Sequence, residues 1–332
     1  MAPAISIVIP TYNRIARLRA TLDALVRQTI DKALFEIIVV DDGSEENIAG
    51  IVTELATTSH ADLRYVRQKR AQAGSARNRG ILEARSSLVL LMDNDILVSP
   101  HHVGRHLDLH LKYPAPEIGV LGRIVPGGSG VDLLRRRESD IKPNGFMTGG
   151  EPIIAESYLV TADVSLKKDF IVQSGMFKPY LPVVEDMDLA LRLRDRGLCL
   201  LYCREAEAVH TEPLDTIDKV ISEGKKYGRA FAEWKGRIPL YQDEIWKLGG
   251  RFNGGLKHFR SHPAGYAKDA VRRWTINRAT IGILVRIARR KRISDPPPFL
   301  LARLCKEIWA FYYRNEFAAN HRSPSTHKRS PN

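Results

Sequence analysis

Cysteine and long apolar runs are scarce in this sequence. Among 332 residues there are 3 cysteines, Cys199, Cys203 and Cys305, and no C-x-x-C pair. So sparse and odd a set excludes a disulfide framework and predicts buried free thiols in a reducing compartment. No stretch approaches the roughly 20 apolar residues of a membrane-spanning helix. The first residues lead straight into an apolar strand and not into a signal peptide. We therefore expect a cytoplasmic protein.

Acidic residues are scarce in the last third of the chain. Residues 216–332 hold 25 of the 51 Lys and Arg but only 9 of the 38 Asp and Glu, whereas residues 1–215 are nearly neutral. This asymmetry predicts an anionic partner, either a membrane surface or nucleic acid. Alternatively, the cations only solvate the outer face of packed helices. The chain contains no zinc-finger or RNP motif, which disfavours nucleic acid.

Strand-like and helix-like patterns alternate through the first 100 residues. We expect strands at 5–9, 35–40, 63–66 and 88–92, the first ending at Pro10, and helices at 14–27, 45–57 and 75–85. This alternation predicts an α/β fold with a doubly wound, mostly parallel sheet flanked by helices.

The later patterns divide the chain further. We expect a Gly- and Pro-rich loop at 126–150, strands at 158–166, 198–202 and 206–209, and helices at 186–194, 268–292 and 299–313. The predicted domains are residues 1–213 (halves 1–98 and 99–213), a basic helical C-terminal extension at 214–320, and a disordered tail at 321–332.

Two carboxylates follow the apolar run at 88–92. Asp93 and Asp95 flank Asn94 at the predicted carboxyl end of a buried strand, where ligands bind in open α/β sheets. Two hard oxygen ligands suit a divalent cation that also holds phosphate oxygens. A D-x-D pair alone is also common in solvated turns and helix caps.

Three further segments are expected to lie beside this pair. Pro10-Thr11-Tyr12-Asn13 ends the first strand, Asp41-Asp42-Gly43-Ser44 ends the second, and Arg77 lies on the helix before the third. Converging strand ends predict a nucleotide pocket, in which a carboxylate accepts from a base or ribose and an arginine neutralises phosphate. Taken singly, each segment is equally consistent with a cap, a turn or a solvated charge.

The combination resembles family-2 glycosyltransferases of the GT-A fold. The segments that carry the resemblance are 7–13, 37–44, 76–78, 91–95, the G-x-F element at 175–177 and the E-D motif at 184–193. Together they span roughly residues 4–212, about two-thirds of the chain.

The resemblance implies roles for individual residues. Asp186 would be the catalytic base of an inverting, hexosyltransferase-like reaction with Glu185 beside it, and Asp42 would bind the nucleobase. The metal ligands would be Asp93, Asp95 and His210, holding Mn²⁺ or Mg²⁺. The implied nucleotide-sugar-binding residues are Pro10, Thr11, Tyr12, Asn13, Asp41, Asp42, Arg77, Asp93 and Asn94.

The implied partners are a nucleotide-sugar donor, first of all a UDP-sugar, and a glycan or lipid-linked acceptor in surface glycan or polysaccharide synthesis. The location would be the cytoplasmic face of a membrane. Two positions depart from the family pattern. Ile96 replaces a further acid after the D-x-D pair, and Asp163 replaces the Asn of a small-Asn-x-Ser segment, so the contacts of Asp163 are open.

Two other functions remain alternatives. The chain could be a non-catalytic protein that its basic part tethers to a membrane or to nucleic acid. It could also be a nucleotidyltransferase, although Pro10–Arg14 lacks the Gly-rich loop expected there.

Overall fold

The computed structural model describes residues 2–127, 153–154, 159–179, 181, 183, 185–212, 216–234 and 278–290, with helical residues at 305, 308, 311–313, 315, 316 and 319. The chain forms two compact units. The first comprises Met1–Gly128 and Arg136–Glu212, and the second comprises Ser129–Arg135 and Pro213–Asn332. Each unit is described by itself.

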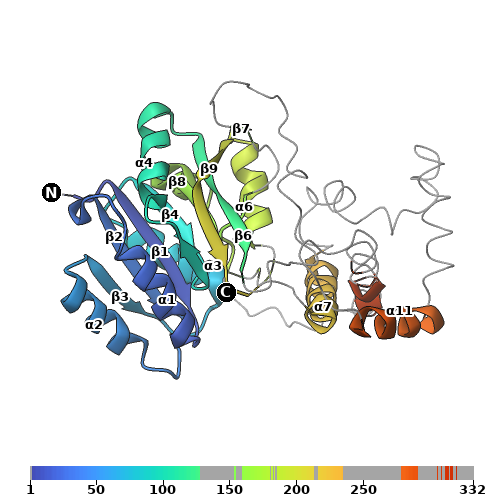
Figure 1. Cartoon of the computed structure of the whole chain (residues 1–332). Coiled ribbons are helices and arrows are strands. Elements are labelled where there is room, and N and C mark those ends of the chain that lie inside the picture. Colours follow the sequence, from blue (N-terminus) through green and yellow to red (C-terminus); the bar gives the residue numbers. More distant parts are fainter. Residues whose placement is uncertain are drawn as a thin grey trace, which may run out of the picture. The chain divides into compact units, whose positions relative to one another are not determined.

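The first unit is built on one large sheet (Figure 1). Its N-terminal strands are β1 (Ile5–Thr11), β2 (Phe35–Asp41), β3 (Leu63–Arg67) and β4 (Leu88–Met92). They run parallel in the order β3-β2-β1-β4, as the alternating pattern predicts. Their carboxyl ends therefore meet at one edge of the sheet.

Beyond β4 the sheet becomes mixed. β8 (Asp163–Lys167) runs antiparallel to β4 and to β6 (Ile118–Pro126), and β6 runs parallel to β9 (Cys199–His210). Two short strands, β5 (Ile96–Val98) and β7 (Ile153–Ile154), run antiparallel to β9. Since β9 and β5 are neighbours, the chain after Asp95 lies beside the end of β9.

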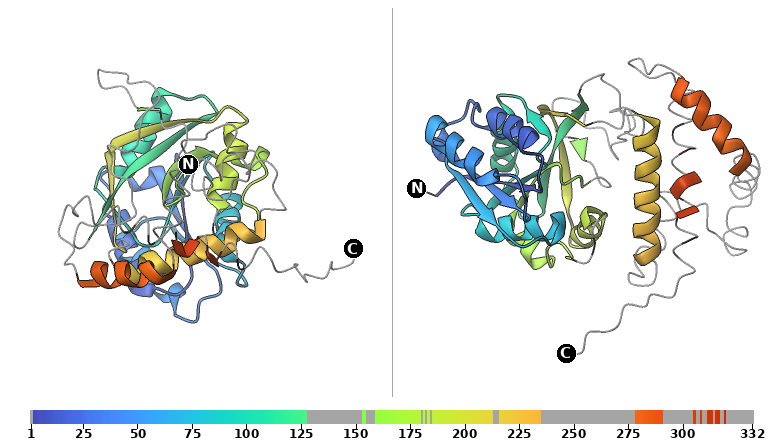
Figure 2. Two further views of the ribbon diagram at one scale, coloured as in Figure 1. Left: turned by 90° about the vertical axis from the view of Figure 1, so that its right-hand side faces the viewer. Right: turned by 90° about the horizontal axis from the view of Figure 1, so that it is seen from below.

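Helices cover both faces of the sheet because successive strand residues point to opposite sides. The odd residues Ile5, Ile7 and Ile9 of β1 pack with α1 (Ile15–Leu25) and α2 (Ile48–Ser59), whereas Val8 packs with α3 (Gln72–Glu83). Figure 2 shows α1 and α2 on the side opposite α3. The remaining helical elements of this unit are η1 (Lys32–Leu34), α4 (His102–Lys112), α5 (Lys168–Gln173) and α6 (Glu185–Arg194).

Several predicted boundaries are wrong. β1 continues through Pro10 to Thr11. Because β4 pairs only with residues 6–8 of β1, the last residues of β1 pair with a neighbouring strand on one side only. Proline is tolerated at such an edge position. α3 begins three residues earlier than expected, β8 begins at Asp163 and not at 158, and β9 is one continuous strand. The predicted loop at 126–150 and the tail at 321–332 lie almost wholly outside the described residues.

The second unit contains α7 (Ile217–Trp234) and α11 (Arg278–Arg290), the latter inside the helix expected at 268–292. An apolar cluster joins them to helical residues of the segment expected at 299–313. Its buried members are Ile217, Val220, Ile281, Val285, Cys305, Ile308 and Phe311. Of the helices described, none combines the length and apolar character needed to span a bilayer.

Candidate active site

The ends of three parallel strands are tied together by hydrogen bonds. Thr11 and Asp41 are register partners, and the Asp42 N–H donates to the Thr11 carbonyl at 2.8 Å. The Asn94 amide, just beyond β4, donates to the Thr11 hydroxyl at 2.8 Å. The predicted segments after β1, β2 and β4 thus meet at one point.

The loop after β1 has an unusual backbone. Asn13 and Arg14 both adopt the left-handed region, with φ of 55° and 64°. Such backbone strain in non-glycine residues clusters at functional sites. Asn13 is held there because its N–H donates to the Ser44 hydroxyl at 2.7 Å and its side-chain oxygen accepts from the Glu45 N–H at 2.9 Å. Asn13 therefore joins the loops after β1 and β2.

Asp41 is a fully buried carboxylate at the end of β2. It accepts hydrogen bonds from the Ser44 N–H, the Tyr65 hydroxyl and the Arg67 guanidinium. Burial alone would raise the pKa of Asp41, but these donors outweigh it and hold the pKa below its ordinary value. In the structure, Asp41 holds the loop after β2 in place.

Asp42 caps α3 from outside the helix. Its carboxylate accepts from the Ala71 and Gln72 N–H groups at 2.7 and 2.9 Å and from the Gln68 side chain at 2.8 Å. A carboxylate offers about four lone-pair sites, so about one remains for a ligand. The next residue must be glycine, since Gly43 has φ +82° and a Cβ there would lie 3.1 Å from the Arg70 nitrogen.

A basic pocket opens beside these loops, and the sequence interpretation missed it. It has a volume of about 580 Å³ and is lined by Gly43, Arg67, Gln68, Lys69 and Arg70. The Arg70 guanidinium lies 3.3 Å from the centre of the Tyr12 ring, in cation–π contact. The run Arg-Gln-Lys-Arg between a strand and a helix was the signal that could have identified it.

Arg77 joins the D-x-D pair to the E-D motif. From α3, this buried guanidinium donates to Asp93 at 2.7 Å and to Glu185, at the start of α6, at 2.8 Å. It therefore lies between two carboxylates that are far apart in sequence. A direct contact of Arg77 with donor phosphate stays a prediction.

Asn78 fixes the same junction from the next position. Its amide donates to the Phe177 carbonyl at 2.8 Å and accepts from the Phe177 N–H at 2.9 Å. The G-x-F element thus packs on α3, and Gly74 allows this close approach because a Cβ there would lie 3.3 Å from Phe177.

Asp186 has a strongly shifted acidity. Burial, followed by the charge of neighbouring Glu185, raises the pKa of Asp186 to about 7, although Arg77 acts in the opposite direction. A carboxylate tuned to neutral pH is suited to accepting a proton.

Asp95 and His210 form a second part of the candidate site. The His210 Nε2 lies 3.7 Å from Asp95 Oδ1, because Ile96 and His210 are partners in the β5–β9 ladder. Arg14 lies 3.7 Å from Asp95 and 3.4 Å from Glu212. Burial is the main cause that raises the pKa of Asp95 above its ordinary value.

The possible ligand atoms of Asp95 and His210 fit a divalent cation. Asp95 Oδ1 is buried and has no hydrogen-bond partner, and the imidazole beside it offers a nitrogen ligand. Two ligand atoms that share an ion about 2.1 Å from each lie about 3–4 Å apart, which includes the observed 3.7 Å. Asp93 lies nearby in sequence, but one of its oxygens is held by Arg77.

A different group of potential metal ligands is more compact. Within the described ranges, His102, His106 and Asp163 are the one set of three whose ligand atoms all lie within 4.8 Å of one another. The sequence interpretation missed this set. The available signals were histidines at 102, 106 and 110, spaced for one helix face, and the unexplained Asp163.

Known glycosyltransferases resemble this chain in sequence. Residues 6–163 match the family model described as glycosyl transferase family 2. Validoxylamine A glucosyltransferase from Streptomyces hygroscopicus subsp. jinggangensis is 38% identical over 122 residues, covering 36% of this chain and 28% of that protein. Glycosyltransferase AglE from Haloferax volcanii is 26% identical over 258 residues, covering 74% of this chain and 75% of that protein.

Solved structures share the fold at low sequence identity. The mannosyltransferase PcManGT from Pyrobaculum calidifontis, in complex with GDP-Man and Mn²⁺, aligns with a TM-score of 0.61 and 15% identity. The alignment covers 96% of this chain and 88% of that one. The predicted GT-A-type α/β fold is therefore confirmed.

Proposed function

We propose that this chain, whose residues 6–163 match glycosyl transferase family 2, moves a sugar from a nucleotide-sugar donor to an acceptor hydroxyl with inversion at the anomeric carbon. The bridge from Arg77 to Asp93 and Glu185 carries the proposal. It connects the strand end where a donor diphosphate would bind with the helix start that bears a base. A protein that only binds an anionic surface needs no such connection.

Asp186 is the proposed base. As the acceptor oxygen attacks the anomeric carbon, its proton passes to the Asp186 carboxylate, and the bond from the sugar to the nucleoside diphosphate breaks on the opposite face. A pKa of about 7 lets this carboxylate be free at neutral pH and still basic enough to take the proton. Glu185, held by Arg77, keeps that pKa high.

Asp93, Asp95 and His210 are the proposed ligands of a divalent cation, Mn²⁺ or Mg²⁺. Such an ion, when bound, stabilises the charge that develops on a leaving diphosphate. The unpartnered Asp95 Oδ1 and the adjacent imidazole support this assignment. PcManGT, which shares the fold, was solved with Mn²⁺.

The nucleotide is proposed to bind across Thr11, Tyr12 and the basic pocket. Asp42 keeps about one acceptor site for a base N–H, and Lys69 and Arg70 bring positive charge to this side of the site. A UDP-sugar is the first donor to test, with GDP-mannose as the comparison because PcManGT binds it.

A thermal-shift screen tests donor binding. The full chain is heated with Mn²⁺ together with UDP, GDP or a set of nucleotide-sugars. A donor present at about a hundred times its Kd should stabilise the protein by about 2.7 kcal/mol. Release of nucleoside diphosphate should then be measured with the donor that gives the largest shift.

Asp95→Asn is the matched variant for this screen, because it keeps the side-chain volume and removes the charge. We expect it to lose the Mn²⁺-dependent part of the shift and the turnover. If no nucleotide shifts the unfolding of the native chain and no nucleotide-sugar is turned over, the proposed function is wrong.

We also propose that the second unit contacts an anionic membrane surface, where a lipid-linked acceptor for surface glycan synthesis would be found. On α11, Ile283 and Ile287 are 57% and 46% exposed and lie one helical turn apart, next to the exposed Arg286. Exposed apolar residues among cations are typical of helices that lie in a membrane interface.

A further inference from the structure

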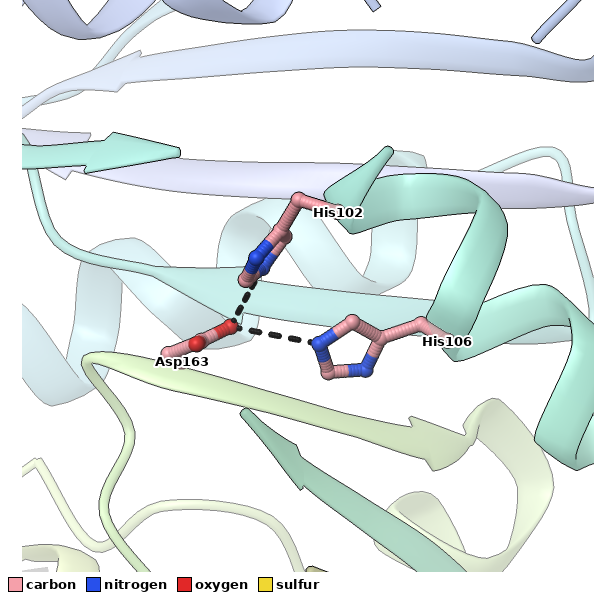
Figure 3. Close-up of side chains that lie close together, drawn as sticks. All are labelled: His102, His106 and Asp163. Atoms are coloured by element: carbon pink, nitrogen blue, oxygen red, sulfur yellow. Dashed lines mark hydrogen bonds and ion pairs between the residues drawn. The ribbon is translucent and has the colours of Figure 1, made fainter. Parts of the chain in front are cut away.

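We propose that His102, His106 and Asp163 form a second metal site, a structural site for a divalent transition-metal ion of the zinc class. The site is separate from Asp95 and His210 and does not depend on the proposed reaction. Figure 3 shows both imidazoles directed at one carboxylate oxygen of Asp163.

The three side chains are completely buried, each with 0% exposure. The two histidines lie one turn apart on α4, and Asp163 is the first residue of β8. Buried charges in proteins are paired or coordinate metals. The two imidazoles and the carboxylate must therefore share either protons or a metal ion.

The hydrogen bond of His102 settles which ring nitrogen carries the proton. Its Nδ1 lies 3.2 Å from the Glu207 carbonyl, which can only accept, so Nδ1 must donate. In the neutral ring, Nε2 then presents a lone pair. That lone pair points at Asp163 Oδ1, another acceptor, only 2.9 Å away.

The same tautomer is open to His106. Its Nδ1 lies 2.8 Å from the Ser165 hydroxyl, which also lies 2.8 Å from His110 Nε2. If the hydroxyl donates to His110, it accepts from His106 Nδ1, and His106 Nε2 is left with a lone pair 3.4 Å from Asp163 Oδ1.

A proton cannot satisfy all of these atoms. A proton on each Nε2 would give Asp163 Oδ1 two donors, but Asp163 Oδ2 would stay buried with no hydrogen-bond partner. A cation held by both Nε2 atoms and the carboxylate satisfies the whole group. Gly122 allows the Asp163 carboxylate to pack against its backbone, since a Cβ at Gly122 would lie 1.9 Å from Oδ2.

The donor types select the metal. Imidazole nitrogen favours Zn²⁺, Co²⁺ or Ni²⁺ over Mg²⁺ and Ca²⁺. Tetrahedral ligands at roughly 2.0–2.1 Å from zinc lie about 3.3 Å apart, close to the 3.4 Å between His106 Nε2 and Asp163. The Glu207 carbonyl and Ser165 hydroxyl hold the outer nitrogens, as outer-shell partners of metal-bound histidines do.

The site would brace the strand that leads to the active site. Asp163 is the register partner of Met92, and the Asp93 N–H donates to the Ala162 carbonyl at 3.2 Å. An ion bound at Asp163 would therefore join α4 to the strand pair that ends at Asp93. Because the site is closed to solvent, loading is expected during folding.

Metal content is the direct test. The full chain, purified without chelators, should contain about one zinc ion per molecule, as measured by elemental mass spectrometry of the digested protein. Protein refolded with Co²⁺ should show the visible absorption of tetrahedral cobalt bound to nitrogen and oxygen. Refolding with Zn²⁺ should raise the melting temperature by about 5 °C or more over refolding with a chelator.

Asp163→Asn removes the charge and keeps the shape, and it should reduce zinc affinity at least about tenfold. The control is Glu36→Gln, which alters another fully buried carboxylate that is bonded to Ser6 and is not part of this cluster, and it should keep the zinc. If the native chain refolded with excess Zn²⁺ or Co²⁺ holds no ion, or if Asp163→Asn binds zinc with the same affinity as the native chain in a chelator competition, the proposal is wrong. The native-chain measurement decides the question even if a variant does not fold.

Discussion

Asp186 shows how the environment of one side chain shifts its pKa. The pKa of Asp186 is about 7 in the folded chain, because the side chain is partly buried beside Glu185. Ionisation of this carboxyl therefore destabilises the folded state. The same arrangement that suits it to the proposed role of base therefore costs folding free energy at neutral and alkaline pH.

The first prediction concerns activity and pH. Since Asp186 must be ionised to accept a proton, kcat/KM should fall as pH drops below about 7 and level off above it. Asp186→Asn should reduce transfer by about 10²–10⁴-fold while donor binding persists. Steady-state rates and thermal shifts with the same donor measure the two effects.

Stability supplies an independent check on the same variant. The native carboxyl has a raised pKa, so its contribution to stability is lost as pH rises through about 7. Asp186→Asn should therefore be more stable than the native chain at pH above about 8, by about 1 kcal/mol, and show little gain near pH 3, because the loss accumulates between about pH 4, the ordinary pKa of the unfolded carboxyl, and about pH 7. Loss of donor affinity in this variant would instead make Asp186 a binding residue.

The residues that sequence could locate are those at the ends of regular elements. Asp93, Asp95 and Asp42 follow apolar strands, and such positions meet at the edge of a parallel sheet. The partners of Arg77 could not be predicted in the same way. Its contact with Glu185 joins positions 108 apart, and only the packing of α6 on the sheet brings them together.

At the scale of elements, α3 is positioned by a residue outside it. Asp42 accepts from two N–H groups at the start of α3. This single carboxylate therefore anchors the helix that carries Arg77 and Asn78. Its predicted nucleobase contact and its observed capping role can be separated by experiment.

The second prediction uses two cap variants. Asp42→Ala should lower the free energy of unfolding by about 1–2 kcal/mol, because it removes three hydrogen bonds. Asn47→Ala, at the start of α2, removes one and should cost less. Urea unfolding measures both. Unchanged stability with lost donor affinity in Asp42→Ala would contradict the capping role.

Elements with a simple period were predictable, and the others were not. β4 was predicted to the residue because five consecutive apolar residues read as a strand buried on both faces. α4 was missed because its buried face carries His102, His106 and His110, which no apolar pattern marks. The antiparallel direction of β8 was also missed, since strand direction depends on the connection and leaves no local signal.

At the scale of the whole molecule, charge is divided between the two units. The excess of Lys and Arg belongs to residues 216–332, whereas the residues of the active site lie in the first unit. The proposed membrane contact and the proposed transfer chemistry therefore belong to different parts of the chain, and each can be changed separately.

The third prediction concerns membrane binding. The full chain should cosediment with vesicles containing phosphatidylglycerol and not with pure phosphatidylcholine. Binding should weaken as ionic strength rises from about 0.1 to 1 M, because the Debye length falls from about 10 to 3 Å. The double variant Ile283→Ser with Ile287→Ser should bind about tenfold or more weakly.

Leu111→Ser is the control, since Leu111 is 78% exposed in the first unit. It should bind vesicles like the native chain. Equal binding of the double variant and the native chain would show that α11 does not enter the interface.

The pairing of β5 with β9 has a consequence for which insertions and deletions the chain can tolerate. β9 already contains extra residues opposite Gly122 and Arg123, where the ladder shifts register, so a change of length there can be absorbed. Between Glu207 and His210 the ladder is continuous, and one inserted residue would turn the imidazole to the opposite side of the sheet. Homologues should therefore vary in length upstream of this four-residue stretch and keep it constant.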